Sequence, residues 1–564
     1  MARAADRGLI PYGSSGGTHL TSSSLEKKQA RRAELVRRLS ELAPKKRADA
    51  LLETVDGRAL VRSIPAEDVY PTLVEVGLAD ASEVVQLGTV DQFRTWVDLA
   101  SWQKDRVDPL EVLAWLRAAR GEDELDYLDK LKGLDLELIE LIYKRLAVIH
   151  DLEENPDANP EGVTFETPEG KFLVEFMVEG ADLEALRKLT DDLMSKNPFE
   201  LARFLEAVRH ESPTELEETA FQFRQARLQD LGFPPLDEAV KLFAFIDPAR
   251  VTVLAPTPGL VPPSSVDFVD ATLRSLDAHE RSVLEAEVRY LVNTALVAEG
   301  AEPGDPQAIR RVSEQARDWV NLGLEHLCSG DPARAADVVR EHTLKKVFQI
   351  GFSLTLLLKR KAEALAQEQG ARFADTWLAM DEETLALQAL LRKRPLKAIK
   401  VPGAQPLPFR FRRELAESEL MLERVRAQRQ VFLALLGSSP AEVIARFGMR
   451  LQDLTPQRLF AAVVARLEID APAGPAPFPA LKLTELCARI FEGEATLPGL
   501  RPGAGEKAKQ ALAAQFPAIS GEVNGMVERV FTGFLTDFGA AWVRDLKVDP
   551  KKVLVLPIEG ELLP

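Results

Sequence analysis

The chain has 564 residues, of which 46% are hydrophobic and 28% are charged, and its formal net charge is −17. This composition is typical of a folded soluble protein, and the length exceeds what one hydrophobic core supports, so we expect several domains or an array of repeats. The negative charge argues against general nucleic-acid binding, because surfaces that bind nucleic acid are usually basic. The only cysteines, Cys328 and Cys487, form no CxxC motif and indicate a reducing, cytoplasmic location.

The N-terminal sequence lacks the apolar segment of a signal peptide, and we expect residues 1–25 to be a flexible polar tail. The longest apolar run is Val347–Leu358. Because a helix needs about 20 apolar residues to span a bilayer, this run predicts a buried helix and no transmembrane segment.

Many prolines directly follow a residue that can cap a helix, as in Asp108-Pro109, Asp305-Pro306 and Thr455-Pro456. A polar cap accepts hydrogen bonds from the first turn, and proline at the next position loses no needed donor, so these pairs predict helix starts. The segment "LDLELIELIYKRLAVIHDLEE" places apolar residues on one stripe from Leu138 to Ile149, which predicts one helix through Ile149.

Strand patterns are scarce. Two alternating runs in "VTFETPEGKFLVEFMV" flank Pro168-Glu169-Gly170 and predict a hairpin. We therefore predict an all-α, multi-domain helical repeat or bundle protein with one small β-hairpin at about residues 163–177.

Shifts in composition divide the chain into helical parts and linkers rich in proline or basic residues. The predicted segments are a tail (1–25), a solenoid-like helical domain (26–155), a hairpin with a helical domain (156–250), a proline-rich linker (251–265), a helical bundle (266–390), a basic extended linker (391–413), a helical segment (414–470), a Pro/Ala linker (471–480) and a C-terminal helical domain (481–564).

Short amphipathic helices, each preceded by a turn signal, recur in the first part of the chain, as in "LSELAPKKRADALLE" and "DRVDPLEVLAWL". Residues 33–155 resemble the helical N-terminal domain of MgtE-type magnesium transporters. The membrane helices and the CBS module of those transporters have no counterpart here, so the resemblance does not imply transport.

The middle of the chain, with "RQARLQDLGFPPLDEAVKLFAFIDP" and "WVNLGLEHLCSGD", is similar to an uncharacterised all-helical bacterial domain family of unknown function. That similarity implies a helical fold and no activity. Residues 319–340 also resemble one tetratricopeptide hairpin, since Trp319, Leu322, Gly323 and Ala335 stand at its spacing. No second copy follows, so this motif predicts close helix packing within a larger bundle.

Catalytic signatures are missing from the sequence: it contains no phosphate-binding loop, no nucleophile elbow and no zinc motif. We predict no cofactor. One group, Glu325, His326, Cys328 and His342, could approach each other on a hairpin, but its spacing is not that of a metal site, and we interpret these residues as packing residues. An acidic stretch is interpreted as a solvated helix face, although it leaves open a magnesium-sensing role. Its acids are Glu122, Asp123, Glu124, Asp126, Asp129, Asp135 and Glu137.

A strongly basic stretch without acids occupies residues 391–413, and two phenylalanines alternate with its arginines. Such a segment can hold single-stranded nucleic acid by charge and stacking, or dock on an acidic protein surface of this chain or of a partner. Because the chain is acidic overall, we favour docking on protein. The candidate contacts with an anionic partner are Arg392, Lys393, Arg394, Phe409, Arg410, Phe411, Arg412 and Arg413, with Lys397 and Lys400 beside them.

These observations favour a non-enzymatic cytoplasmic scaffold or adaptor that binds other proteins through helical surfaces and the basic segment. Two alternatives stay open at this point. One is a regulatory module that senses a divalent cation through the N-terminal acids. The other is a nucleic-acid-associated protein that uses residues 391–413.

Overall fold

A computed structural model describes residues 39, 42–54, 56–196, 198–258, 266–368, 372–373, 376–399, 404–436, 455–472, 474, 476–492, 499–543, 547–548 and 553–558. The predicted tail and Lys400 lie outside this part of the chain. The chain divides into two compact units. The first unit contains Met1–Pro235 and Leu296–Arg310, and the second contains Leu236–Ala295 and Arg311–Pro564. The finer division into nine segments stays a prediction.

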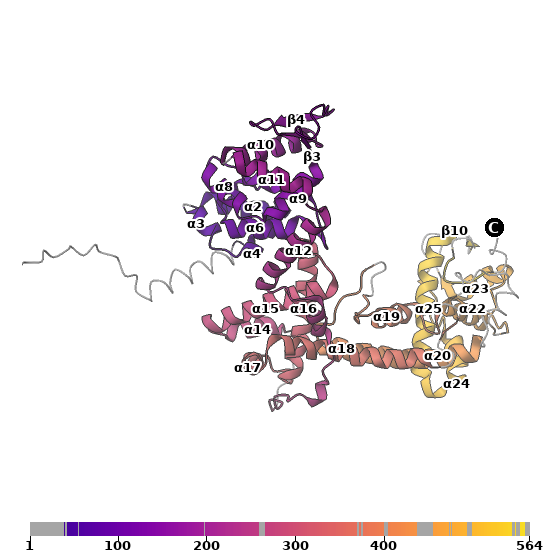
Figure 1. Cartoon of the computed structure of the whole chain (residues 1–564). Helices are drawn as coiled ribbons and strands as arrows, with labels where there is room; N and C mark the ends of the chain where they lie inside the picture. The colour runs from indigo at the N-terminus through magenta and orange to yellow at the C-terminus, as the bar shows by residue number, and fades with distance from the viewer. Residues whose placement is uncertain are drawn as a thin grey trace, which may run out of the picture. The chain divides into compact units, whose positions relative to one another are not determined.

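Short helices build most of the first unit (Figure 1). They are α2 (Pro44–Glu53), α3 (Gly57–Val61), α4 (Ala66–Val76), α5 (Ser82–Leu87), α6 (Val90–Ala100), α7 (Pro109–Ala119), α8 (Glu124–Lys132), α9 (Leu136–Leu146), α10 (Gly180–Lys196), α11 (Pro198–His210) and α12 (Pro213–Asp230). Asp108 caps α7 as predicted, because its carboxylate accepts hydrogen bonds from the amides of Leu110 and Glu111. In the core, the indole of Trp96 contacts that of Trp115 with ring centroids 6.3 Å apart.

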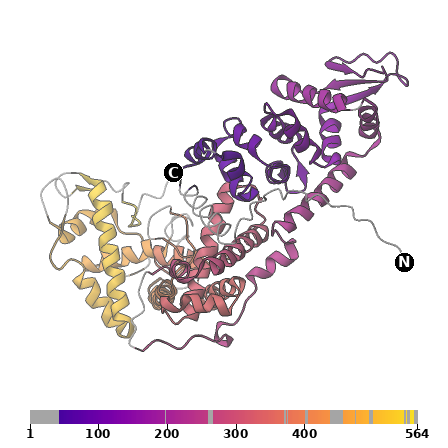
Figure 2. The ribbon, with the colours of Figure 1, turned by 90° about the vertical axis from the view of Figure 1, so that its left-hand side faces the viewer.

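A three-stranded antiparallel sheet follows α9 and corrects one prediction (Figure 2). The predicted hairpin is present as β4 (Val163–Glu166) and β5 (Phe172–Phe176), but β5 also pairs with β3 (Ala147–Asp151). The predicted helix through Ile149 is therefore wrong beyond Leu146. Ala147 takes an extended conformation, with φ −143° and ψ 156°. The backbone of β3 then pairs with β5, whose Phe172 and Val174 side chains are fully buried.

Longer helices dominate the second unit. They are α14 (Phe268–Ser275), α15 (Ala278–Glu299), α16 (Pro306–Leu327), α17 (Ala335–Glu341), α18 (Leu344–Gln367), α19 (Asp381–Leu390), α20 (Arg412–Leu436), α22 (Pro456–Glu468), α23 (Leu483–Ile490), α24 (Glu506–Gln515) and α25 (Ser520–Ala541), with the short turns α13 (Leu236–Ala239), η1 (Val240–Phe243), η2 (Pro248–Arg250), η3 (Pro332–Arg334), η5 (Ala480–Lys482) and η6 (Pro517–Ile519). The end of α15 and the start of α16 belong to the first unit.

Several antiparallel pairs of two-residue strands accompany the helices. They are β1 (Trp102–Gln103) with β2 (Arg106–Val107), β6 (Arg372–Phe373) with β7 (Thr376–Trp377), β8 (Phe491–Glu492) with β9 (Gly499–Leu500), and β10 (Trp542–Val543) with β11 (Lys547–Val548). Helices still make up most of the described residues, which confirms the all-α class.

The tetratricopeptide-like residues mark a close helix crossing, but the partner helix differs from the predicted one. A Cβ atom on Gly323 of α16 would lie 2.1 Å from the carbonyl oxygen of Val347 in α18, and one on Gly351 of α18 would lie 1.9 Å from that of Trp319. Only glycine allows backbones to approach this closely. The expected second helix of the hairpin is α17, which has only seven residues, and Gly323 faces α18 instead.

Two apolar clusters lie in the C-terminal part of the second unit. One joins α22, α23, α24 and α25 with the end of α20, and the other joins α18, α19 and the first half of α20. The predicted buried helix around Val347–Leu358 is α18, in which Phe348 and Leu358 are almost fully buried. None of the described helices combines the length and apolar character needed to cross a membrane.

Candidate functional site

The C-terminal half of the basic segment is docked on acidic and amide groups of its own unit. The Arg410 guanidinium pairs with the carboxylate of Asp267, and its Nε lies 3.6 Å from Oδ1 of Asp318. Burial raises the pKa of Asp318 to about 6, and Arg410 opposes this shift. The backbone N–H of Arg412 donates to Glu325 at 2.8 Å. The side chain of Arg410 is thus engaged within the chain, whereas Arg412 is bonded through its backbone and its side chain is exposed.

The aromatic residues of this half serve different purposes. Phe409 is completely buried in the cluster formed by α18, α19 and α20. The guanidinium groups of Arg410 and Arg413 each lie 5.5 Å from the ring centroid of Phe411. Glu414, in the first turn of α20, accepts hydrogen bonds from the backbone N–H groups of Arg410 and Phe411, which fixes the start of the helix. Phe409 is therefore a core residue and is closed to a partner.

The N-terminal end of the basic segment also presents exposed cations. Arg392 and Lys393 are exposed, and Lys359 of α18 donates to the carbonyl of Arg392 at 2.9 Å. Arg360 lies 4.0 Å from the ring centroid of Phe245, and Arg394 lies 3.9 Å from that of Phe243. We call Lys359, Arg360, Arg392, Lys393 and Arg394 the basic patch.

Four charges of the basic patch, those of Lys359, Arg360, Arg392 and Lys393, are only weakly compensated in the described residues. Within the described part of the chain, no carboxylate lies at ion-pair distance from Arg360, Arg392 or Lys393. Lys359 makes a long contact of 3.7 Å with Glu363. In a chain of net charge −17, such a group of cations is a local reversal of the overall field.

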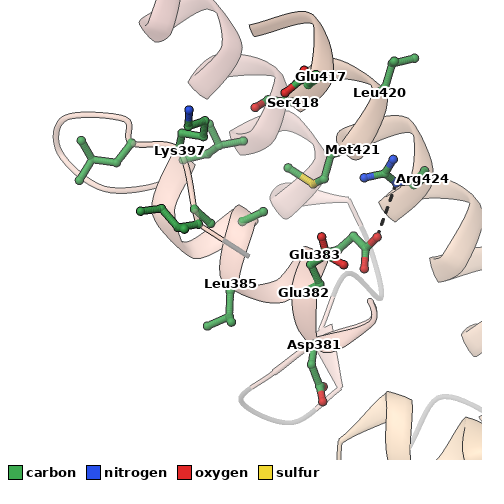
Figure 3. Close-up of a pocket in the computed structure, with 15 residues that line it drawn as sticks. Asp381, Glu382, Glu383, Leu385, Lys397, Glu417, Ser418, Leu420, Met421 and Arg424 are labelled. Carbon is green, nitrogen blue, oxygen red and sulfur yellow. Dashed lines mark ion pairs between the residues drawn. The ribbon is translucent and has the colours of Figure 1, made fainter. Parts of the chain in front are cut away.

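A groove of about 550 Å³ lies between α19, α20 and residues 396–399, which continue the basic segment (Figure 3). Its lining is mainly apolar, and Leu385 of α19 and Leu420 of α20 are each 58% exposed. Large apolar side chains beside a hollow of this size are typical of a binding surface. The helices are held in place because Leu387 and Leu422 pack in the cluster below.

Charged groups along the groove are mostly acidic. Asp381, Glu382 and Glu417 are exposed on its lining. Its two cations already have partners: Lys397 pairs with Glu414, and Nε of Arg424 lies 3.5 Å from Oε1 of Glu383, as the dashed line in Figure 3 shows. Glu383 is 1% exposed and also pairs with Arg529 at 2.6 Å. The groove therefore suits an apolar surface flanked by positive charge.

Comparison with known proteins gives one relationship. A model described as "Family of unknown function (DUF6178)" matches residues 24–559, nearly the whole chain. The chain belongs to the DUF6178 family. This finding confirms the predicted membership of an uncharacterised helical family, whereas the resemblance to the MgtE N-terminal domain stays a prediction. No curated protein and no solved structure matches the chain.

In this DUF6178 protein, the residues considered as metal ligands have other contacts. Cys328 is buried, its Sγ donates to the carbonyl of Leu324, and burial raises its pKa to about 12. Burial lowers the pKa of His326 and so favours its neutral form. His342 ends α17. In the described residues, no group of three or more His, Cys, Asp or Glu side chains could hold a metal ion.

Part of the acidic stretch of the DUF6178 chain is paired with cations. Asp126 bonds to Arg58 at 2.6 Å, to Arg62 at 2.8 Å and to the buried Lys130. These cations hold the pKa of Asp126 below its ordinary value, against the effect of its own partial burial. Asp123 caps α8 by accepting from the backbone of Asp126. Carboxylates used in this way offer few oxygens to a magnesium ion.

Sequence reasoning missed the groove. Leu385 and Leu420 stand at ordinary positions of amphipathic helices, and no motif marks them. They line one groove because Leu387 of α19 and Leu422 of α20 share one apolar cluster. The basic segment at residues 391–413 did extend to the groove, since Lys397 lines it.

Proposed function

We propose that this DUF6178 protein is a non-enzymatic scaffold or adaptor that binds partner proteins. Its principal docking surface is the α19–α20 groove, and its occupant is an amphipathic helix of a partner with lysine or arginine beside the apolar stripe. The observation that carries the proposal is the pair of half-exposed leucines, Leu385 and Leu420, on two helices that line one apolar hollow.

Charge supports the choice of occupant. The exposed charges along the groove are mainly carboxylates, among them Glu417, so a helix flanked by basic residues complements them. An acidic occupant would meet repulsion from Asp381 and Glu417.

The direct test uses a fluorescently labelled model peptide with leucines at helical spacing and lysines on either side of that stripe. Leu385→Glu/Leu420→Glu should weaken its binding about tenfold or more, because charges replace the apolar anchors. The matched control is Leu236→Glu/Leu481→Glu, since Leu236 and Leu481 are 59% and 99% exposed in the same unit and lie outside the groove. Equal weakening in both variants would show that the peptide binds any exposed leucine and would refute the proposal.

A second test uses cells that make the full-length protein with a photo-crosslinking residue at Ser418, which lines the groove. We expect a defined protein adduct whose yield falls when Leu385→Glu is added. An adduct that does not respond to this substitution would place the docking surface elsewhere.

Nucleic-acid association through residues 391–413 is a second candidate function. The exposed Arg392 and Lys393 favour an anionic ligand, while the buried Phe409 and the engaged Arg410 are not available to this function. Divalent-cation sensing has less support, because Asp126 is already surrounded by Arg58, Arg62 and Lys130. A calorimetric titration with Mg²⁺ that gives no heat would reject it.

A further inference from the structure

We infer that the basic patch is a second binding site, separate from the groove, and that it takes an acidic, carboxylate-rich segment of a protein. The site is formed by the C-terminal part of α18, by residues 392–394, and by Phe243 and Phe245, all of which belong to the second unit.

The first argument is preorganisation. Arg394 stacks on Phe243, and Phe243 is itself held in edge-to-face contacts with Trp319 at 5.8 Å and Phe352 at 5.1 Å. Arg360 stacks on Phe245 in the same way at 4.0 Å. The exposed guanidinium of Arg360, stacked in this way, keeps its planar edge available to donate two parallel hydrogen bonds to a carboxylate, and it loses little conformational freedom on binding.

The second argument is charge. Arg360, Arg392 and Lys393 lack a carboxylate partner among the described residues, whereas Lys361, the next residue of α18, pairs with Glu419 at 2.6 Å. Holding several like charges together without compensation costs free energy, and an anionic ligand would relieve that repulsion.

The third argument separates an acidic protein segment from nucleic acid. Stacking of bases needs open aromatic faces, but Phe243 is enclosed by aromatic neighbours and covered by Arg394, and Arg360 covers one face of Phe245. The net charge of −17 also repels a long polyanion more than a short acidic segment.

The experiment measures binding of a labelled oligoglutamate peptide to the full-length protein by fluorescence anisotropy, with oligoglutamine and a single-stranded oligonucleotide as competitors. Arg392→Gln/Lys393→Gln should weaken oligoglutamate binding about tenfold, because two charge-assisted contacts are lost. The matched control, Arg250→Gln/Arg274→Gln, removes two exposed positive charges elsewhere in the same unit and should change binding less than about twofold.

Two further variants test the stacking itself. Arg360→Lys keeps the charge but loses the planar stack, and Phe245→Leu removes the platform at a 36% exposed position where folding is not at risk. Each should weaken binding about threefold to tenfold at low salt. Leu385→Glu/Leu420→Glu should leave oligoglutamate binding unchanged, so failure of the groove and failure of the basic patch are distinguishable.

Several results would overturn the inference. Equal weakening by the patch and control variants would show general electrostatic attraction. If an oligonucleotide binds more tightly than oligoglutamate and displaces it, the ligand of the basic patch is nucleic acid and the proposed acidic protein segment is wrong. If oligoglutamate does not bind at low salt, the basic patch is not a binding site for acidic segments.

Discussion

Asn321 and Arg410 lie 89 positions apart in the sequence, and Nδ2 of Asn321 donates to the carbonyl of Arg410 at 2.8 Å. The Oδ1 atom of the same buried amide accepts the backbone N–H of Phe268 at 2.7 Å. One side chain of α16 thus fixes both the start of α14 and the end of the basic segment.

Replacing this amide should destabilise the second unit. We expect Asn321→Ala to lower the free energy of unfolding by about 2–3 kcal/mol, because it leaves a buried backbone donor and a backbone acceptor without partners. Urea unfolding followed by tryptophan fluorescence measures the change. Gln388→Ala, at an exposed position of α19, serves as the control. A loss no larger than that of the control would contradict the structural role of Asn321.

The two halves of the basic segment should respond differently to mutation. Arg410→Ala should lower the free energy of unfolding by about 1 kcal/mol, because it removes the ion pair with Asp267. Arg392→Ala should change it by less than about 0.5 kcal/mol, because the Arg392 side chain is exposed and has no carboxylate partner in the described chain. Thermal melts of both variants check this, and the reverse order of effects would contradict the division.

The close crossing of α16 and α18 should not tolerate a Cβ atom at Gly351. Gly351→Ala should destabilise the protein by about 3 kcal/mol or more, because the new Cβ would lie 1.9 Å from the backbone oxygen of Trp319. Gly525→Ala in α25 is the matched control, since a Cβ there meets nothing within 4 Å. That variant should gain up to about 1 kcal/mol from helix propensity. Similar melting temperatures for the two variants would be inconsistent with the close crossing.

Stability of the first unit should depend on pH through Glu140. Burial raises the pKa of this residue from 4.5 to about 7, and Glu211 and Glu137 add to the effect. Because the folded-state pKa is raised, folding disfavours the ionised form, and stability is lost as the pH rises from about 4.5 to about 7.

Glu140→Gln should therefore stabilise the protein by up to about 3 kcal/mol at pH 8 and by much less near pH 4.5. Urea midpoints at several pH values measure this. Glu124→Gln, at an exposed position of α8, serves as the control. A Glu140→Gln gain that is independent of pH would point to packing instead of ionisation.

Both cysteines should be unreactive in the folded protein. Burial raises the pKa of Cys328 and that of Cys487 to about 12, so the thiolate fraction at pH 8 is on the order of 10⁻⁴. Iodoacetamide followed by mass spectrometry should label neither residue at pH 8 without denaturant and both in guanidinium chloride. Rapid labelling of either cysteine in the folded state would contradict its burial.

The sequence by itself determined the local structure. Apolar periodicity and proline after a cap predicted helices such as α7 and α22, whose caps Asp108 and Thr455 accept the expected backbone hydrogen bonds. Alternation predicted the β4–β5 hairpin. Family membership followed in the same way, from residues that are close in the sequence.

Only the tertiary structure decided which of these residues meet. Ile149 fits the apolar stripe of α9, yet it lies in β3, because pairing with β5 satisfies its backbone and overrides local helical periodicity. The basic segment has a uniform composition, but the Arg410 side chain pairs with Asp267 and the Arg412 backbone N–H donates to Glu325, whereas Arg392 and Lys393 are exposed. Those contacts join residues about a hundred positions apart, and helical or strand periodicity reports only on near neighbours in the chain.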